Sequence, residues 1–243
     1  MGSGTAGQEA LPAETMVQSV VDEMNRFRRD PRGYAEEMMT LQDCYNGNIL
    51  TYPESHLELE TVEGVVALND CLQDLLHAVP LPELVLSQAI CCACLQHLAD
   101  LHEHNFCSHI GTDGSTPEER LARFGDHREQ CGENVVFRML SAREAVYHML
   151  IDDGSAERGH RANLLNMDFH FVGVAFGKHQ SAEAALVVLM VDHFHARPAE
   201  ATQLKRAVLE SQWVGAAISG EGAAREAAIH KAWDQLMEDL KPQ

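Results

Sequence analysis

Three short polar motifs within residues 107–171 constrain the fold of this chain more than any other feature of its sequence. They are centred on His109, on Glu133 and on His160. Each motif stands at the boundary of an expected helix or strand, so each brings a polar side chain to the end of an element. We therefore expect a fold in which these element ends lie together and line one cleft.

Two aspartates, Asp152 and Asp153, end a helix expected between the second and third motifs. Two imidazoles and two carboxylates on one cleft suit either a divalent cation or acid–base chemistry. The alternative is a hydrogen-bonded network in which the same side chains tie down a turn and cap a helix. The residues alone leave both readings open.

The composition is that of a globular protein with a strong negative charge. Apolar residues make up 45% of the 243 residues, which is enough for a substantial core. The 18 Lys and Arg face 37 Asp and Glu, giving a net charge of −19. Nucleic acids and anionic membranes would repel such a chain, so neither is an expected partner. No apolar run is long enough to predict a transmembrane helix.

The N-terminus and the cysteines favour a cytoplasmic location. The first residues lack the basic and apolar regions of a signal peptide. If the N-terminus has been trimmed, a secreted location is the alternative. The seven cysteines are an odd number, and Cys91, Cys92 and Cys94 fall in one apolar helical stretch. Such cysteines are typical of buried thiols in a reducing compartment.

Periodicity and turn residues predict a mixed α+β chain. Asp30-Pro31 ends the first helix, since the residue before proline avoids helical backbone angles. Capping-box patterns at Ser115–Glu118 and Ser141–Glu144 each predict a helix start. Residues 43–61 read as a loop or an edge excursion. The expected helices cover residues 16–29, 34–39, 64–77, 87–104, 115–125 and 141–152, and the expected strands cover 132–137 and an antiparallel hairpin of 171–176 and 186–191.

Three regions follow from these patterns. Residues 1–15 are small and polar and are expected to be disordered, residues 16–198 form the main domain, and residues 199–243 form a C-terminal helical extension. The apolar positions of its last helix lie on one face, which must pack on the domain, on a partner or on a second copy of the chain. These positions are Ile229, Trp233, Leu236 and Leu240.

The ordered set His109, Gly132-Glu-Asn134 and Gly159-His-Arg-Ala-Asn163, followed by a hairpin, resembles the CAP superfamily. This family comprises the cysteine-rich secretory, antigen 5 and pathogenesis-related-1 proteins, also called SCP-domain proteins. The match spans roughly residues 16–195 and looks closest to the bacterial and protist branch. The resemblance implies an α+β fold, with a three-layer α/β/α sandwich around a small antiparallel sheet.

The resemblance also implies a cleft lined by His109, Glu133, His160 and an acidic residue at the end of the 143–152 helix. The family most often has glutamate at that last position, whereas this chain offers aspartates. Asp153 continues the inward helical stripe of the preceding residues, so we favour it over Asp152. With two imidazoles in the set, zinc is the most natural divalent cation.

Several functions fit this resemblance. The first is a cation-binding cleft whose physiological ligand is unknown. Lipid or sterol binding would need an apolar groove between residues 16–29 and 87–104, although the same apolar stripes are explained by core packing. A protein-interaction module would use the C-terminal helix. Metal-dependent hydrolysis ranks below these functions, because the sequence shows no pattern that indicates a catalytic nucleophile or an oxyanion hole.

Arg158 and Arg161 flank His160 and could offer an anion site. We expect them instead to form salt bridges with the acidic residues nearest in sequence and so to orient the turn. These acids are Asp152, Asp153 and Glu157.

Overall fold

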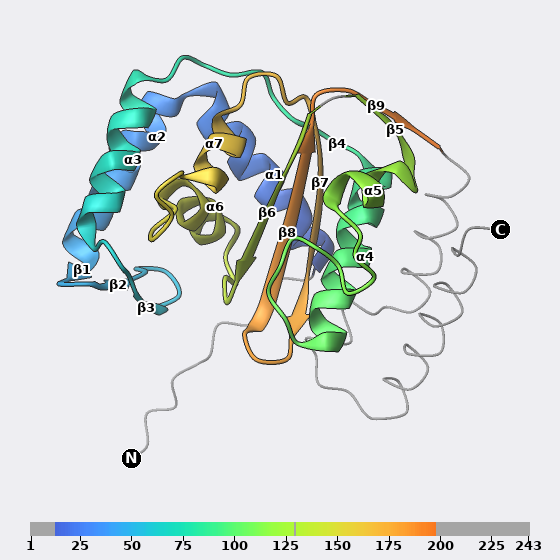
Figure 1. Cartoon of the computed structure of the whole chain (residues 1–243). Coiled ribbons are helices and arrows are strands. Elements are labelled where there is room, and N and C mark those ends of the chain that lie inside the picture. The colour runs from blue at the N-terminus through green and yellow to red at the C-terminus, as the bar shows by residue number, and fades with distance from the viewer. Residues whose placement is uncertain (1–12, 129, 198–243) are drawn as a thin grey trace.

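A computed structural model describes residues 13–128 and 130–197, which form a three-layer α/β/α sandwich (Figure 1). The central sheet has four strands in the order β4-β7-β8-β6. The α+β class and the layered architecture expected from the sequence are both confirmed. The strands are β4 (Val85–Leu86), β6 (Cys131–Phe137), β7 (Phe171–His179) and β8 (Glu183–Val191). All pairs are antiparallel except that of β4 with β7.

The predicted hairpin is confirmed as β7 and β8, and both strands are buried on both faces. Alternate residues of a strand point to opposite faces of the sheet. Val174 and Val188 accordingly belong to one hydrophobic cluster, while Ala175 and Val187 belong to the other. A run of apolar residues without polar alternation is what a strand between two helical layers requires.

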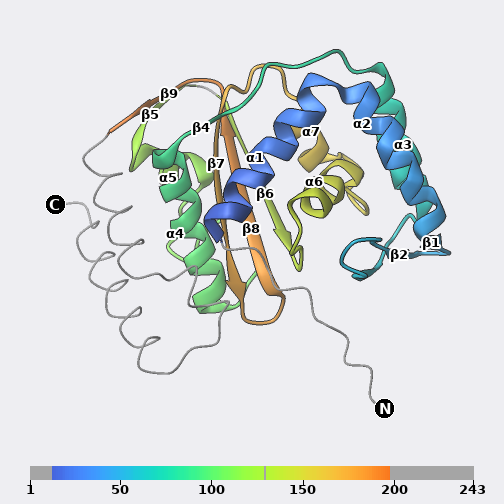
Figure 2. The same cartoon turned by 180° about the vertical axis from the view of Figure 1, so that it is seen from behind.

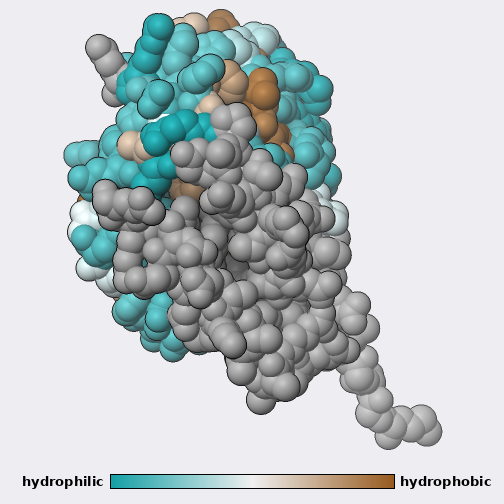
Figure 3. All heavy atoms as spheres, turned by 90° about the vertical axis from the view of Figure 1, so that its right-hand side faces the viewer, coloured by the Kyte–Doolittle hydropathy of each residue, from teal (hydrophilic) through white to brown (hydrophobic). Residues whose placement is uncertain are grey.

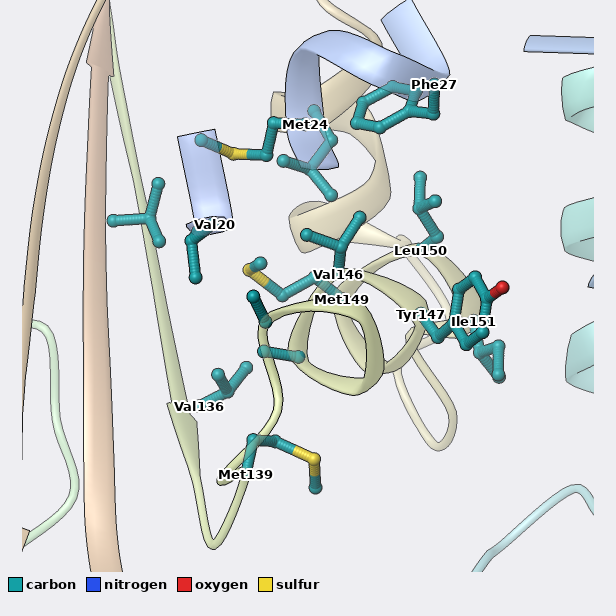
Figure 4. Close-up of a cluster of buried hydrophobic side chains, with 14 of the residues drawn as sticks. Val20, Met24, Phe27, Val136, Met139, Val146, Tyr147, Met149, Leu150 and Ile151 are labelled. Atoms are coloured by element: carbon teal, nitrogen blue, oxygen red, sulfur yellow. The ribbon is translucent and has the colours of Figure 1, made fainter. Parts of the chain in front are cut away.

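The larger helical layer holds α1 (Ala13–Arg29) and α6 (Ala142–Ile151), which pack together against the sheet. Val20 and Met24 of α1 meet Val146 and Met149 of α6 in the cluster that Figure 4 shows. The same side of the sheet carries α2 (Pro31–Met38), α3 (Val65–His77) and α7 (Gly159–Leu165), as Figures 1 and 2 show.

The smaller layer holds α4 (Gln88–His104) and α5 (Pro117–Ala122). Helix α4 approaches the sheet closely at Gly173 of β7, where a Cβ would lie 2.5 Å from the backbone nitrogen of Cys91 and nearer still to the carbonyl carbon of Ile90. Only glycine leaves room for the helix backbone at this position. The packing of α4 on the sheet therefore depends on the absence of a side chain.

Helix boundaries follow local chemistry. The first helix ends at Arg29 as predicted, and the Asp30 side chain caps α2 by accepting from Gly33 N at 2.9 Å. The capping box of α5 forms one residue later than expected, between Thr116 and Glu119, because Pro117 occupies the first helical position. The box expected at Ser141 is wrong. Ser141 makes no side-chain cap, and the Glu144 carboxylate instead accepts from Ser55 N at 3.0 Å.

The sequence missed several short elements. Residues 43–61 contain the end of a 3₁₀ helix (Met39–Cys44) and a three-stranded sheet of β1 (Tyr45–Asn46), β2 (Ile49–Thr51) and β3 (Glu58–Glu60). A further pair joins β5 (Gly125–His127) to β9 (Phe194–Ala196). The disorder expected for residues 1–15 falls almost wholly outside the described residues, and the C-terminal extension lies entirely outside them.

A buried arginine links the ends of four segments. Arg28, at the C-terminal end of α1, is fully buried, and burial lowers the pKa of its guanidinium to about 10. Its nitrogens donate to the backbone carbonyls of Pro82, Leu164, Asn166 and Phe169 at 2.7–3.2 Å. These carbonyls lie outside the strand ladders, so this side chain gives hydrogen bonds to backbone that no strand pairing provides.

Replacing Gly173 by alanine tests the contact between α4 and the sheet. The added methyl group overlaps the α4 backbone, so we expect Gly173→Ala to lower the free energy of unfolding by about 1–3 kcal/mol or more. Urea denaturation measures the change. Gly159→Ala is the matched control, because a Cβ at Gly159 meets nothing within 4 Å. Equal stability of the two variants would show that α4 shifts to make room for the methyl group without any loss in the free energy of unfolding.

Candidate functional site

His109 and Glu133 form the first part of the candidate site. Glu133 lies on β6 with its side chain 2% exposed, and its carboxylate accepts from the His109 Nδ1–H at 3.0 Å. His109 lies in the segment between α4 and α5, and half of its side chain is exposed. With Nδ1 donating to the carboxylate, His109 keeps the lone pair of Nε2.

The second oxygen of Glu133 is held by an arginine that the sequence did not single out. Arg120 of α5 is buried, and its guanidinium donates to Glu133 Oε2 at 2.6 Å. It also donates to the backbone carbonyls of Ser115 and His109 at 2.8 and 3.1 Å. One side chain therefore neutralises the buried carboxylate and fixes the segment that carries the imidazole. The capping-box helix start was the signal that could have placed Arg120 here.

A further histidine, His97 of α4, stands behind this pair. Its Nε2 lies 2.8 Å from the Ser108 carbonyl and 3.7 Å from Glu133 Oε1. Burial lowers the pKa of His97, and the negative charge of Glu133 opposes this only in part. The ring is therefore neutral near pH 7, with its proton on Nε2 toward the carbonyl. His97 is fully buried and is packed in the core.

His160 and Asp152 form a second pair. Asp152 Oδ2 accepts from the backbone N–H groups of His160 and Arg161 at 2.8 and 3.3 Å, and Oδ1 lies 3.3 Å from His160 Nδ1. Burial raises the pKa of Asp152, but the hydrogen bonds from His160 and from these backbone groups outweigh it and lower the pKa overall. His160 thus also turns Nδ1 to a carboxylate and keeps Nε2.

The preference for Asp153 over Asp152 needs correction. Asp153 accepts from the backbone N–H groups of Val62 and Glu63 at 2.6 and 2.8 Å, just before α3. Helix α6 ends at Ile151, and Asp152 adopts left-handed backbone angles with φ 50°. The helical stripe that favoured Asp153 therefore stops before reaching it, and Asp152 is the acid beside His160.

Strand β6 separates the two pairs. Glu133 points to the α4/α5 layer, whereas its neighbour Asn134 donates to the His160 carbonyl at 3.1 Å in the other layer. Asn163 of α7 donates to Asn134 Oδ1 at 2.8 Å and packs on Gly132, where a Cβ would collide with it. The site is thus two carboxylate–histidine pairs joined through one edge strand.

Within residues 13–128 and 130–197, no three His, Cys, Asp or Glu side chains are grouped so as to hold a metal ion.

The arginines beside His160 pair with other acids than expected. Arg158 binds Glu63 at 2.6 Å and Asp70 at 3.1 Å, while Arg161 binds Asp70 and Asp74 at 2.9 and 2.8 Å. The carboxylate of Asp152 is already taken by backbone N–H groups, and α3 presents acids on the facing side. These ion pairs hold the turn before α7 against α3, so the turn has no free anion site.

An apolar groove between α1 and α4 is not formed. The two helices lie in different layers, and their apolar stripes belong to separate clusters on opposite faces of the sheet. The alternative explanation of these stripes as core is the correct one. No helix in the described part of the chain has the length and apolarity to cross a membrane.

Removing the charge of Glu133 tests whether the site depends on the buried ion pair. Glu133→Gln leaves the Arg120 guanidinium buried without a countercharge, so we expect unfolding to become easier by about 3–5 kcal/mol. Chemical denaturation gives the value, with Glu157→Gln as the control because Glu157 is exposed. A loss below about 1 kcal/mol would mean that the pair adds little.

His148 of α6 predicts how stability depends on pH. Burial, helped by the charge of His160, lowers its pKa from 6.5 to about 4. Between these values the unfolded chain binds a proton that the folded chain refuses, so stability rises as the pH rises from about 4 to 6.5. We expect His148→Gln to flatten this rise in denaturation curves, whereas His77→Gln, at an exposed position, should keep it. Equal slopes in the two variants would contradict the assignment.

Comparison with known proteins assigns the chain to a family. The model of the cysteine-rich secretory protein (CAP) family matches residues 21–191. No curated protein matches the chain. A solved extracellular protein with an SCP domain from Bacillus anthracis is 26% identical over 46% of this chain, with a TM-score of 0.38, and the chain spans 35% of its length.

An outer surface protein from Borrelia burgdorferi is 19% identical and covers 46% of this chain and 80% of its own, with a TM-score of 0.40. The family model covers well over half of the chain, including β6, α7 and both strands of the hairpin. By this match, the chain belongs to the cysteine-rich secretory protein (CAP) family.

Proposed function

We propose that this CAP domain is a binding module that takes up a divalent cation through His109 and His160 at the edge formed by β6. The supporting observation is that each imidazole turns Nδ1 to a buried carboxylate, Glu133 or Asp152, and keeps Nε2 for a ligand. Metal-binding histidines usually have such a carboxylate behind them, since it fixes the ring and makes the other nitrogen a better donor.

The roles of the two acids differ from those first expected. Both oxygens of Glu133 are engaged, one with His109 and the other with Arg120. Both oxygens of Asp152 face α7, toward its backbone N–H groups and the His160 ring. The carboxylates therefore orient the imidazoles rather than supply further ligands.

Two imidazole nitrogens are fewer ligands than a structural or catalytic zinc site uses. We therefore propose weak and reversible binding, with water or a group from a partner completing the coordination. Zinc remains the preferred cation because imidazole suits it. Hydrolysis is not part of the proposal, since the described site offers neither a third protein ligand nor an activated nucleophile.

Calorimetric titration with zinc chloride at pH 7.5 tests the proposal. Exposed Cys107 is first replaced by serine, because a free thiol would also bind zinc. In this background we expect one zinc per chain, and we expect either His109→Ala or His160→Ala to abolish the saturable heat. His77→Ala on α3 is the matched control and should bind as the parent does.

Lowering the pH to 5.5 should weaken binding, because protonated imidazole cannot bind a metal. Unchanged binding in both single histidine variants would overturn the proposal. Loss in only one of them would show that the two imidazoles do not share the ion.

A further inference from the structure

A second site is built between α4 and α5, apart from both histidine pairs. A cavity of about 300 Å³ is lined by these helices and by the segment from Thr112 to Ser115. None of His109, Glu133, Asp152 or His160 lines it. The described residues visible on this side of the molecule are mainly hydrophilic (Figure 3).

Three nitrogen atoms among the lining side chains lack a hydrogen-bond partner. They are Gln96 Nε2, His97 Nδ1 and Arg120 Nε, each buried within the described part of the protein. The three residues are at most 5% exposed. A buried polar atom without a partner costs free energy, and three in one cavity wall indicate a polar ligand.

These three atoms have defined roles in hydrogen bonding. Arg120 Nε and Gln96 Nε2 can only donate. His97 is neutral and places its proton on Nε2 toward the Ser108 carbonyl, so its Nδ1 accepts. The wall therefore presents two donors and one acceptor. Hydroxyl groups match this set, because each can both accept and donate hydrogen bonds.

The charges around the cavity exclude simple ions. The positive charge of Arg120 is already compensated by Glu133, and that of Arg123 by Asp113 at 2.9 Å. Asp100 and Glu103 add further negative charge to the lining, which would repel an anion. A cation would face the two N–H donors of the wall. Neutral hydroxyl groups can accept from the nitrogens and donate to the carboxylates.

We propose that this cavity binds a small, neutral, polyhydroxylated molecule of about monosaccharide size. The volume lies at the lower end of the roughly 300–1,000 Å³ found for small-molecule sites. Its hydroxyl groups accept from the buried nitrogens of Gln96 and Arg120 and donate to His97 Nδ1 and to the exposed carboxylate of Glu103. The proposal does not rest on the cation proposed above, although Arg120 also binds Glu133 of that site.

Nuclear magnetic resonance of the ¹⁵N-labelled full chain tests this assignment directly. The probes are D-glucose, D-galactose, N-acetyl-D-glucosamine and myo-inositol, with sodium acetate and ethylammonium chloride as charged comparisons. We expect at least one neutral probe to shift the Arg120 Nε–H and Gln96 side-chain amide signals in a saturable way. The charged probes should leave both signals in place.

Two variants locate the ligand. Gln96→Leu removes one donor from the wall and should weaken binding about tenfold, the effect of one lost hydrogen bond. Glu103→Gln, at an exposed lining position, should weaken it by a few-fold without affecting folding. Gln73→Leu, exposed on α3, is the matched control and should bind as wild type does.

The proposal is overturned if no neutral probe gives saturable shifts, if acetate binds more tightly than every sugar, or if a folded Gln96→Leu protein binds equally well. A last comparison distinguishes two sources of the same chemistry. Methyl glycosides that bind as well as the free sugar support recognition of the end of a glycan. Binding of the free sugar alone supports a free metabolite.

Discussion

Buried guanidinium groups hold together the parts of this domain that no helix or strand ladder reaches. Arg28, Arg120 and Arg161 are among its largest fully buried side chains. Arg28 and Arg161 donate to backbone carbonyls as far as 141 and 94 residues away, and Arg120 donates to carbonyls 5 and 11 residues before it. A planar group with five N–H donors satisfies several carbonyls at once, which lysine could not do. The irregular segments that carry the site have fixed shapes for this reason.

Strand β6 decides how the site can work. Because its residues alternate between faces, Glu133 serves the α4/α5 layer while Asn134 serves α7. Every partner of these two side chains is therefore set by the register of β6 on β8. A slip of one residue would exchange the two environments and place a carboxylate where an amide is needed. The two histidines are linked to each other through this strand.

Much of the fold was predictable from the sequence, because apolar periodicity and turn residues act locally. The long helices, the strand at residues 131–137 and the hairpin fall close to where their patterns placed them. The short strands β1 to β3 were not predicted, because two or three residues are too few to show the alternation of apolar and polar residues that indicates a strand. The partners of Arg158 and Arg161 escaped for another reason. They lie on α3 or just before it, and only tertiary packing brings this part of the chain beside α7.

In the candidate site, too, local features were predictable from the sequence and features that depend on tertiary packing were not. His109 and Glu133 were expected in the site and are in contact, whereas the role of Arg120 depends on how α5 packs beside β6. The choice between Asp152 and Asp153 turned on where a helix ends, which is the least certain feature of any sequence pattern. A single residue in left-handed conformation reversed the outcome.

The contacts of Arg28 have a consequence for synthesis of the chain. Its acceptors at Leu164, Asn166 and Phe169 follow it by 136 to 141 residues, so they leave the ribosome long after α1 does. Strand β7 comes after them, and without it the central sheet cannot form. Helix α1 therefore cannot complete its packing against the sheet until most of the domain has been translated. Nascent chains that stall before β7 should be the ones that need chaperone protection.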